Sequence, residues 1–223
     1  MNEGAVIGEL LDRLQAARSS GHEVVLVDGG SEDDTIAKAA GKVDLLLRNQ
    51  AGRARQMNRG ARESSGQWLW FLHADSCLPA DWLQQLEAAC SSGASPWGFF
   101  DVRLDNPRWP YRVIAWFMNR RSRLTRIATG DQGIFVRREL FFARNCYADL
   151  PLMEDIDLSR RLKGYEPTCL QGPLTTSARR WEEGGILRTV LRMWSLRLAF
   201  WLGVPPRRLS RHYPLCSSPN TES

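Results

Sequence analysis

The stretch QWLWFLHAD, residues 67–75, is an apolar run that ends abruptly in polar residues. Bounded by Gly66 and Pro79, a run of this length is typical of a buried β-strand. Ligands of open α/β sheets bind just beyond the carboxyl ends of the strands, which is where this stretch puts Asp75. A carboxylate in that position can hold a divalent cation, and the cation can neutralise a diphosphate. The alternative, equally open on these residues alone, is that Asp75 caps a helix beginning near Pro79.

A second expected strand, residues 23–27, also ends in a carboxylate. Asp28 is followed by Gly29, Gly30 and Ser31, which are small enough to let a ligand approach the backbone. Strand and helix patterns alternate along residues 5–104, which predicts a doubly wound, mostly parallel α/β sheet in a single domain. Two carboxylates at strand ends favour a nucleotide site over two helix caps.

The second half of the chain carries further polar clusters. An arginine-rich helix is expected over residues 111–126, and the sequence Gly130-Asp131-Gln132-Gly133 precedes a short strand. An arginine run usually marks a solvated helix face, and the alternative is an anion-binding rim. Glu154 and Asp155 open a helix over residues 156–163, where acidic side chains complement the helix dipole whether or not they have another role.

The expected last helix, residues 185–203, has a broad apolar stripe and follows two short expected strands, 166–170 and 174–178. The stripe recurs at helical spacing and consists of Leu187, Val190, Leu191, Trp194, Leu198, Trp201 and Leu202. Packing against the domain or a partner is the favoured explanation. A helix lying in a membrane interface is the alternative, since Trp, Leu and Arg are favoured there. The polar tail, residues 214–223, is expected to be disordered.

Composition narrows the classes of protein that fit the sequence. Its 223 residues suffice for one α/β domain, and a net charge of +5 suits phosphate-bearing ligands or an anionic membrane surface. Five cysteines, an odd number without a CxxC pair, argue for reduced thiols in the cytoplasm and against a disulfide framework or a zinc site. We expect no signal peptide and, without an apolar run of about 18 residues, no membrane-spanning helix.

Several short motifs occur in a characteristic order along the chain. They are Asn2-Glu3, Val27-Asp28-Gly29-Gly30-Ser31, Gly52-Arg53-Ala54-Arg55-Gln56-Met57-Asn58, Phe71-Leu72-His73-Ala74-Asp75, Gly130-Asp131-Gln132-Gly133, Glu154-Asp155 and Arg180-Trp181. On these motifs the chain resembles the family 2 glycosyltransferases of the GT-A fold, and within them the bacterial subgroup named for arsenosugar biosynthesis. The resemblance runs from Asn2 to about Tyr213 and implies one glycosyltransferase domain over residues 1–213.

The resemblance implies a role for each matching residue. Asp28 corresponds to the aspartate that binds the base or ribose of a nucleotide-sugar, and the same site is implied for Gly29, Arg55, Asn58 and Ala74. Asp75 matches the last carboxylate of the Asp-x-Asp motif, which holds Mn²⁺ or Mg²⁺ against the diphosphate. Asp155, with Glu154 beside it, matches the catalytic base of inverting members. The acceptor or diphosphate region is implied for Gly130, Asp131, Gln132, Arg180 and Trp181.

Together these roles imply an inverting, metal-dependent hexosyltransferase. The implied partners are a nucleotide-diphosphate-sugar donor and a small-molecule or lipid acceptor, without nucleic acid. The implied location is the cytoplasm, at the inner face of the membrane if the last helix contacts lipid. Such an enzyme must stabilise the charge of the leaving diphosphate and hold a base within hydrogen-bond reach of the acceptor hydroxyl.

Two features depart from the family pattern. His73 stands where the usual motif has its first aspartate, which leaves the metal site one carboxylate fewer. The family also begins with an apolar strand ending in Pro-x-x-Asn-Glu, whereas Met1 directly precedes Asn2-Glu3 here. Without that central strand, the sheet would have an open slot and unpaired backbone groups beside it. We therefore expect the natural reading frame to extend upstream of Met1 through about five or six apolar residues.

Three other classes of protein stay open. A non-catalytic protein that binds sugar nucleotides or lipids is favoured by the missing strand and opposed by the presence of Asp28, Asp75 and Asp155. A nucleotidyltransferase would need a glycine-rich basic loop after the first strand. A nucleic-acid binder would use the arginines of residues 111–126, but the aromatic side chains there are expected to be buried rather than arranged for base stacking.

Overall fold

The computed structural model describes residues 1–210, and the tail expected at 214–223 lies outside them. Its strands are β1 (Val25–Asp28), β2 (Leu45–Arg48), β3 (Trp68–Trp70), β4 (Trp97–Leu104), β5 (Phe135–Arg137) and β6 (Thr168–Thr176). β1 and β2 form a parallel pair, and the other strands form a sheet in the order β3-β5-β4-β6. β5 is antiparallel to both of its neighbours, whereas β4 and β6 are parallel. The expected α/β class is confirmed, with β5 as the antiparallel member.

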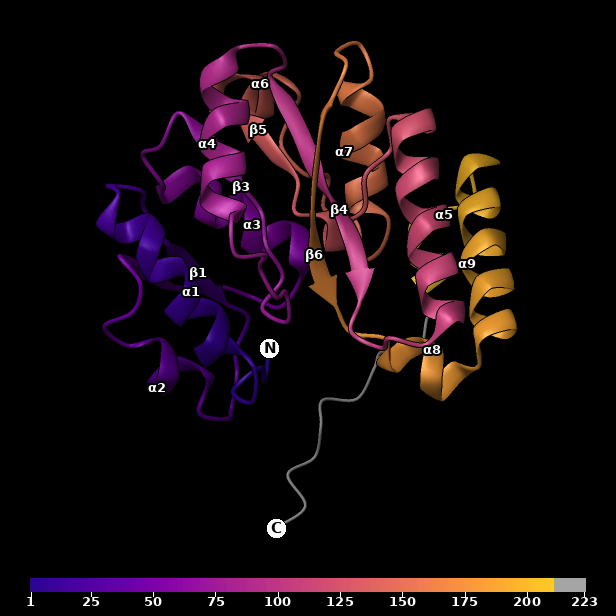
Figure 1. Cartoon of the computed structure of the whole chain (residues 1–223), viewed down its shortest axis with the longest axis horizontal. Coiled ribbons are helices and arrows are strands. Elements are labelled where there is room, and N and C mark those ends of the chain that lie inside the picture. Colours follow the sequence, from indigo (N-terminus) through magenta and orange to yellow (C-terminus); the bar gives the residue numbers. More distant parts are fainter. Residues whose placement is uncertain (211–223) are drawn as a thin grey trace.

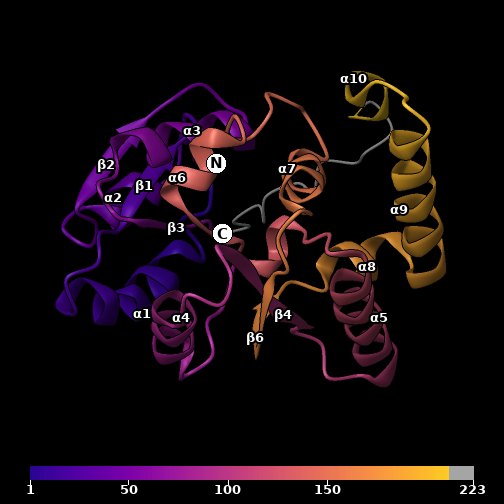
Figure 2. The same ribbon diagram turned by 90° about the horizontal axis from the view of Figure 1, so that it is seen from above.

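Helices cover both faces of the strands (Figures 1 and 2). Their bounds are α1 (Ile7–Ser19), α2 (Thr35–Ala39), α3 (Arg53–Glu63), α4 (Trp82–Ser92), α5 (Trp109–Thr125), α6 (Arg138–Ala143), α7 (Glu154–Leu162), α8 (Arg179–Gly184), α9 (Ile186–Trp201) and α10 (Pro206–Ser210), with a 3-10 turn η1 (Gly130–Gln132). In Figure 2, α1 and α4 lie on one side of the strands, and α3, α6 and α7 lie on the other. The helix expected at 185–203 is α9.

The alternation of side chains along the strands builds a core on each face. Phe100 packs with Trp82 of α4 on one face, and its neighbour Phe99 packs with Phe141 of α6 and Leu158 of α7 on the other. Burying one such side chain contributes roughly 1.5–3 kcal/mol. Because both faces of β4 are apolar, this strand is central and holds the sheet between the two helical layers.

Two expected boundaries are wrong, for identifiable reasons. α4 begins at Trp82 with Asp81 at its N-cap position, so Asp75 caps no helix there and the capping alternative is wrong. The two strands expected at 166–170 and 174–178 form the single strand β6. Its pairing with β4 shifts between Phe100 and Val102, which leaves room for Gly172 and Pro173 in an irregularity rather than a break.

A cavity of about 920 Å³ lies between β1 and β3. Both strands line it over their whole length, together with apolar side chains of α1, α3 and α4. Within residues 1–210, β1 pairs only with β2 and β3 only with β5, so one edge of each strand has no partner strand. The open slot that the sequence predicts is therefore present. Apolar side chains along it lack the dispersion contacts of a closed core.

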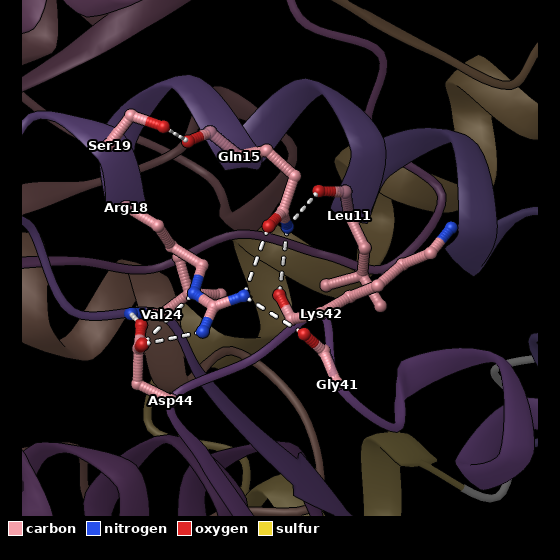
Figure 3. Close-up of polar contacts among 8 residues, drawn as sticks. All are labelled: Leu11, Gln15, Arg18, Ser19, Val24, Gly41, Lys42 and Asp44. Carbon is pink, nitrogen blue, oxygen red and sulfur yellow. Dashed lines mark hydrogen bonds and ion pairs between the residues drawn. The ribbon is translucent and has the colours of Figure 1, made fainter.

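The helix α1 is attached to the two-stranded sheet by polar contacts near its C-terminal end (Figure 3). Gln15 Nε2 donates to the carbonyl oxygen of Lys42 at 2.9 Å. Arg18 Nε donates to Asp44 Oδ1 at 2.9 Å, and Asp44 Oδ2 accepts from the backbone N–H of Val24 at 2.8 Å. These bonds make α1, β1 and β2 one unit, which borders the cavity opposite β3.

Candidate active site

Three segments that are far apart in sequence meet at Gly130. Its backbone N–H donates to Asp155 Oδ2 at 2.7 Å. A Cβ atom added to Gly130 would lie 2.6 Å from His73 Nε2, so only glycine allows this approach. His73 Nδ1 in turn lies 3.5 Å from Asp131 Oδ1. The end of the β3 segment, the turn η1 and the start of α7 thus bring His73, Asp131 and Asp155 into one cluster.

Glu154 and Asp155 form the first turn of α7. Met153 before them has a φ of +68°, a left-handed conformation that is uncommon outside glycine and redirects the chain into the helix. Glu154 is 4% exposed and Asp155 is half-buried. Burial raises the pKa of both carboxyl groups, and in Asp155 hydrogen bonds from the backbone N–H groups of Gly130 and Ile156 oppose this effect. A half-buried carboxylate with a raised pKa is suited to accept a proton.

The contact between His73 and Asp131 shifts the pKa values of the two side chains in opposite directions. Burial acts to lower the pKa of His73, but contact with Asp131 outweighs it and raises that pKa above its ordinary value. Burial acts to raise the pKa of Asp131, but His73 and the positive charges of Arg180 and Arg53 lower it to about 2. The two groups therefore favour an ion pair, which fixes the imidazole beside Gly130.

Asp28 organises the loop that follows β1. Its Oδ2 accepts from the backbone N–H groups of Gly30 and Ser31 at 2.8 and 2.9 Å, and its Oδ1 accepts from Ser31 Oγ at 2.5 Å. Burial acts to raise the pKa of Asp28, but these hydrogen bonds lower it overall. The backbone N–H of Asn2 also donates to Ser31 Oγ at 2.9 Å. The loop residues Gly30 and Ser31 are thus bonded to the carboxylate of Asp28, which lies at the edge of the cavity.

Two of the expected site residues are buried and hold the backbone. Asn58 of α3 donates to the carbonyl oxygen of Tyr147 at 2.8 Å and accepts from the backbone N–H of Tyr147 at 3.0 Å. Gln132 is fully buried, and its Oε1 accepts from Ser122 Oγ at 2.7 Å while its Nε2 donates to the carbonyl oxygen of Phe100 at 3.3 Å. Asn58 therefore positions α3, and Gln132 positions η1 between α5 and β4.

The remaining expected residues of the nucleotide site differ in how they are placed. Gly29 has little space for a side chain, since an added Cβ would lie 2.9 Å from Met1 Cγ. Ala74 is half-buried and lines the cavity. Arg55 does not line the cavity. Its guanidinium instead pairs with Asp149 at 2.9 Å, at an exposed position. Arg55 can reach a nucleotide only by leaving that partner.

Asp75 is exposed at the edge of the cavity. No three His, Cys, Asp or Glu side chains among the described residues converge into a metal cage. Mg²⁺ is commonly held by one or two carboxylates together with substrate phosphates and water. Asp75 therefore fits a cation that is shared with the diphosphate of a donor, and it does not fit a permanently bound ion.

Arg180 and Trp181 lie on α8, and their positions differ. Arg180 lines the cavity together with Asp131, whereas Trp181 packs against Tyr111 and Ile114 of α5. Of the expected pair, Arg180 is therefore the residue that faces the cavity. Trp181 anchors α8 to the body of the domain.

Two arginines of the site were missed by sequence reasoning. Arg53, at the start of α3, lines the cavity, and its charge acts on His73, Asp131 and Asp155. Arg121 of α5 is half-buried beside Asp155, and burial lowers its pKa to about 10. Within the described residues its Nε has no hydrogen-bond partner. The signal for Arg53 was its place directly after Gly52 at a helix start, while nothing in the arginine run marked Arg121.

Comparison with known proteins identifies the family. The model of glycosyl transferase family 2 matches residues 1–149. The chain belongs to this family. A relative is a PGL/p-HBAD biosynthesis glycosyltransferase of Mycobacterium bovis (strain BCG / Pasteur 1173P2), which is 36% identical over 96 residues. The match covers 40% of this chain and 38% of the relative, so it spans well under two thirds of the relative's length.

Solved structures share the fold of this member of glycosyl transferase family 2. S. aureus TarS in complex with UDP-GlcNAc has a TM-score of 0.61 at 17% identity, covering 79% of this chain and 56% of that chain. The mannosyltransferase PcManGT from Pyrobaculum calidifontis, in complex with GDP-Man and Mn²⁺, has a TM-score of 0.58 at 21% identity, covering 89% and 58%. The expected GT-A fold is thus confirmed, while the resemblance to the arsenosugar subgroup stays a prediction.

Proposed function

We propose that this family 2 glycosyltransferase moves a hexosyl group from a nucleoside-diphosphate donor to an acceptor hydroxyl, with inversion and with a divalent cation. The observation that carries the proposal is the lining of one cavity. Asp28, Asp75, Asp131, Arg53 and Arg180 all line it. Carboxylates for a cation and arginines for phosphate therefore face the same space, beside the carboxylate of Asp155.

The donor is held by the residues around β1 and β3. Asp28 and Gly29 contact the nucleoside, and Asp75 binds the cation, which is Mn²⁺ or Mg²⁺. When bound, the cation neutralises negative charge on the leaving diphosphate. Arg53 and Arg180 are placed to bind phosphate oxygens, which strengthens the same stabilisation as the glycosidic bond breaks.

The acceptor side is built by α7 and η1. Asp155 takes the proton of the acceptor hydroxyl, since its raised pKa supports proton uptake and its Oδ2 is fixed by Gly130. Glu154 is more deeply buried; burial, and after it the charge of Asp155, raise the pKa of Glu154, which stands beside the base rather than contacting substrate. Direct displacement needs a base and a leaving group on opposite sides of the sugar. Two separate carboxylates meet this need, because Asp75 serves the cation at the leaving group and Asp155 serves as the base.

Relatives support the class of donor. TarS was crystallised with UDP-GlcNAc and PcManGT with GDP-Man and Mn²⁺, so nucleotide-sugars and a divalent cation bind to proteins of the same fold. The acceptor is a small molecule or a lipid.

A second candidate is a protein that binds a sugar nucleotide without turning it over. The cavity between β1 and β3 favours this candidate, because Asp28 ends β1 and Asp75 follows β3, and within residues 1–210 these strands do not pair with each other. Catalysis requires the two carboxylates at a fixed separation, whereas binding tolerates a looser arrangement.

Turnover of nucleotide-sugars separates the two candidates. UDP- and GDP-hexoses are incubated with the purified chain, and release of the nucleoside diphosphate is measured with Mn²⁺ and with EDTA, alongside donor binding by calorimetry. Mn²⁺-dependent release supports sugar transfer. Donor binding without release under all conditions supports the second candidate, and the absence of both binding and release overturns both.

A further inference from the structure

The apolar stripe of α9 is exposed rather than packed. Trp194 and Trp201 are each 70% exposed and Leu187 is 72% exposed. The helix packs on the domain through its opposite side, with Thr189 and Leu196 buried. The favoured expectation is packing against the domain or a partner, and its first half, packing on the domain itself, is therefore wrong. A stripe of leucine and tryptophan on a free surface indicates an interaction site.

Aromatic residues of α5 are exposed as well. Trp109 is 73% exposed, and Trp116, Phe117 and Leu124 also have most of their surface in solvent. The expectation that the aromatic side chains of residues 111–126 are buried is thus wrong for Trp116 and Phe117, whereas Tyr111 is buried as expected. Both views place α5 and α9 together at the end of the molecule that is far from β1 and β2 (Figures 1 and 2). Side chains of α5 share a buried cluster with Ile186 at the start of α9.

The positive charge of the protein is concentrated on these helices. Of the chain's 30 basic residues, nine are arginines of α5, α9 and α10, which contain no acidic residue. The remainder has 21 basic and 25 acidic residues and is therefore net negative. Arg188 and Arg192 of α9 and Arg112 and Arg120 of α5 are exposed. The excess of positive charge thus lies beside the exposed apolar side chains.

We propose that α5 and α9 bind the surface of an anionic lipid bilayer, with α9 lying in the plane of the interface. Tryptophan and leucine enter the boundary between headgroups and acyl chains, and arginine binds the anionic headgroups. No helix of residues 1–210 is long and apolar enough to cross a bilayer. The leucine-rich stripe favours lipid over nucleic acid, because leucine offers no stacking surface for bases.

This surface is connected to the candidate active site. α8, which carries Arg180 on the cavity wall, leads directly into α9. Resting on the proposed function, the inference narrows the acceptor to one presented at a lipid surface. The membrane contact itself does not depend on sugar transfer, so the two can fail separately.

Vesicle co-sedimentation tests the proposal with the full chain. Vesicles of phosphatidylcholine alone are compared with vesicles containing phosphatidylglycerol, at low and at physiological salt. We expect binding to the anionic vesicles, weakened by salt. The double change R188Q and R192Q should weaken it by about 30-fold, from roughly 1 kcal/mol for each arginine. The matched control R59Q and R62Q, which removes two exposed arginines of α3, should leave it unchanged.

The aromatic contribution is tested by W194S and W201S, which should weaken vesicle binding by roughly 10-fold or more. Y165S is the control, since Tyr165 is an exposed aromatic residue outside this surface. Thermal melting and donor binding should be the same as in the parent chain, because the exchanged tryptophans are exposed. The proposal is overturned if the parent chain binds no vesicles, if the variants bind as well as the parent, or if W194S and W201S instead abolish self-association or nucleic-acid binding.

Discussion

The two sheets within residues 1–210 carry the two halves of the candidate active site, and they are built differently. β1 and β2 carry Asp28, and their side toward β3 faces a cavity of about 920 Å³. The sheet of β3, β5, β4 and β6 supports His73, Asp131 and Asp155, and its central strand is packed on both faces. The half that we propose binds the donor therefore rests on the less densely packed part of the molecule.

The proposed base, Asp155, and the proposed donor-binding residue, Asp28, therefore lie in parts of the molecule that are fixed to different degrees. Around Asp155, Gly130 donates a hydrogen bond to the carboxylate and packs closely against His73. The turn that contains Gly130 is fixed in turn by the buried side chain of Gln132, which bonds to β4. Around Asp28, the loop is fixed by its own hydrogen bonds, and β1 is held by β2 and by Gln56 of α3, whose Nε2 donates to the carbonyl oxygen of Val27 at 2.8 Å. Within residues 1–210, however, β1 pairs with no strand of the larger sheet. We expect substitutions in the two halves to affect activity and stability in different ways.

The largest effect is expected from Asp75→Ala, on the cavity edge. Turnover and Mn²⁺-dependent binding of the nucleotide should both be lost, because this carboxylate is the proposed cation ligand. The melting temperature should not change, since Asp75 is exposed. Calorimetric titration of a nucleoside diphosphate with and without Mn²⁺ measures the effect. The exposed Asp81, six residues further on, gives the control Asp81→Ala, and normal turnover of Asp75→Ala would remove the metal role.

Asp155→Asn should affect catalysis alone. The amide keeps the size of the side chain but cannot accept the proton, so turnover should fall by roughly 10²-fold or more while donor binding changes little. Steady-state kinetics and calorimetry on the same preparation measure the two quantities. Asp157→Asn, one residue pair further along α7, is the matched control. Equal turnover of Asp155→Asn and the parent would leave Asp155 as a charge at a helix end.

Packing in the two halves can be compared directly with Leu174→Ala and Leu11→Ala. Leu174 is fully buried in the larger sheet, and its loss should lower the free energy of unfolding by about 2–5 kcal/mol. Leu11 is also buried but lines the cavity, so fewer contacts are lost and the cost should be at the low end of that range. Urea unfolding of both variants measures the difference. Equal costs would contradict the account of an open slot.

The smallest effect is expected from Glu154→Gln. Burial raises the pKa of Glu154 above its ordinary 4.5, so the folded state binds this proton more tightly than the unfolded state does. Stability is therefore lost as the pH rises from about 4.5 through the folded pKa, and the neutral glutamine should raise the melting temperature at pH 7. The gain should vanish below about pH 4. A melting temperature that falls at pH 7 would show that the carboxylate is stabilised rather than strained.

The sequence predicts the fold class and the strand-end carboxylates because these depend on local patterns. The apolar run ending at Asp28 marks the end of β1 without any tertiary information, whereas β3 ends at Trp70, five residues before Asp75. The contact of Gly130 with His73 and the burial of Arg121 depend on how η1 and α5 pack, so no local pattern contains them. The exposure of Trp194 could not be predicted either, since a periodic apolar stripe has the same spacing whether it faces a core, a partner or a membrane.

The most direct test of the comparison is to fill the slot between β1 and β3. A segment of about six apolar residues, followed by proline and two further residues, is joined ahead of Asn2, and a Gly/Ser segment of equal length is the control. Because Asn2 is held to the loop after β1, the added segment can enter the slot from its carboxyl end. The account predicts that the apolar segment raises the melting temperature by about 5 °C or more and tightens donor binding, whereas the control does neither. Identical melting temperatures and donor affinities for the two segments would contradict it.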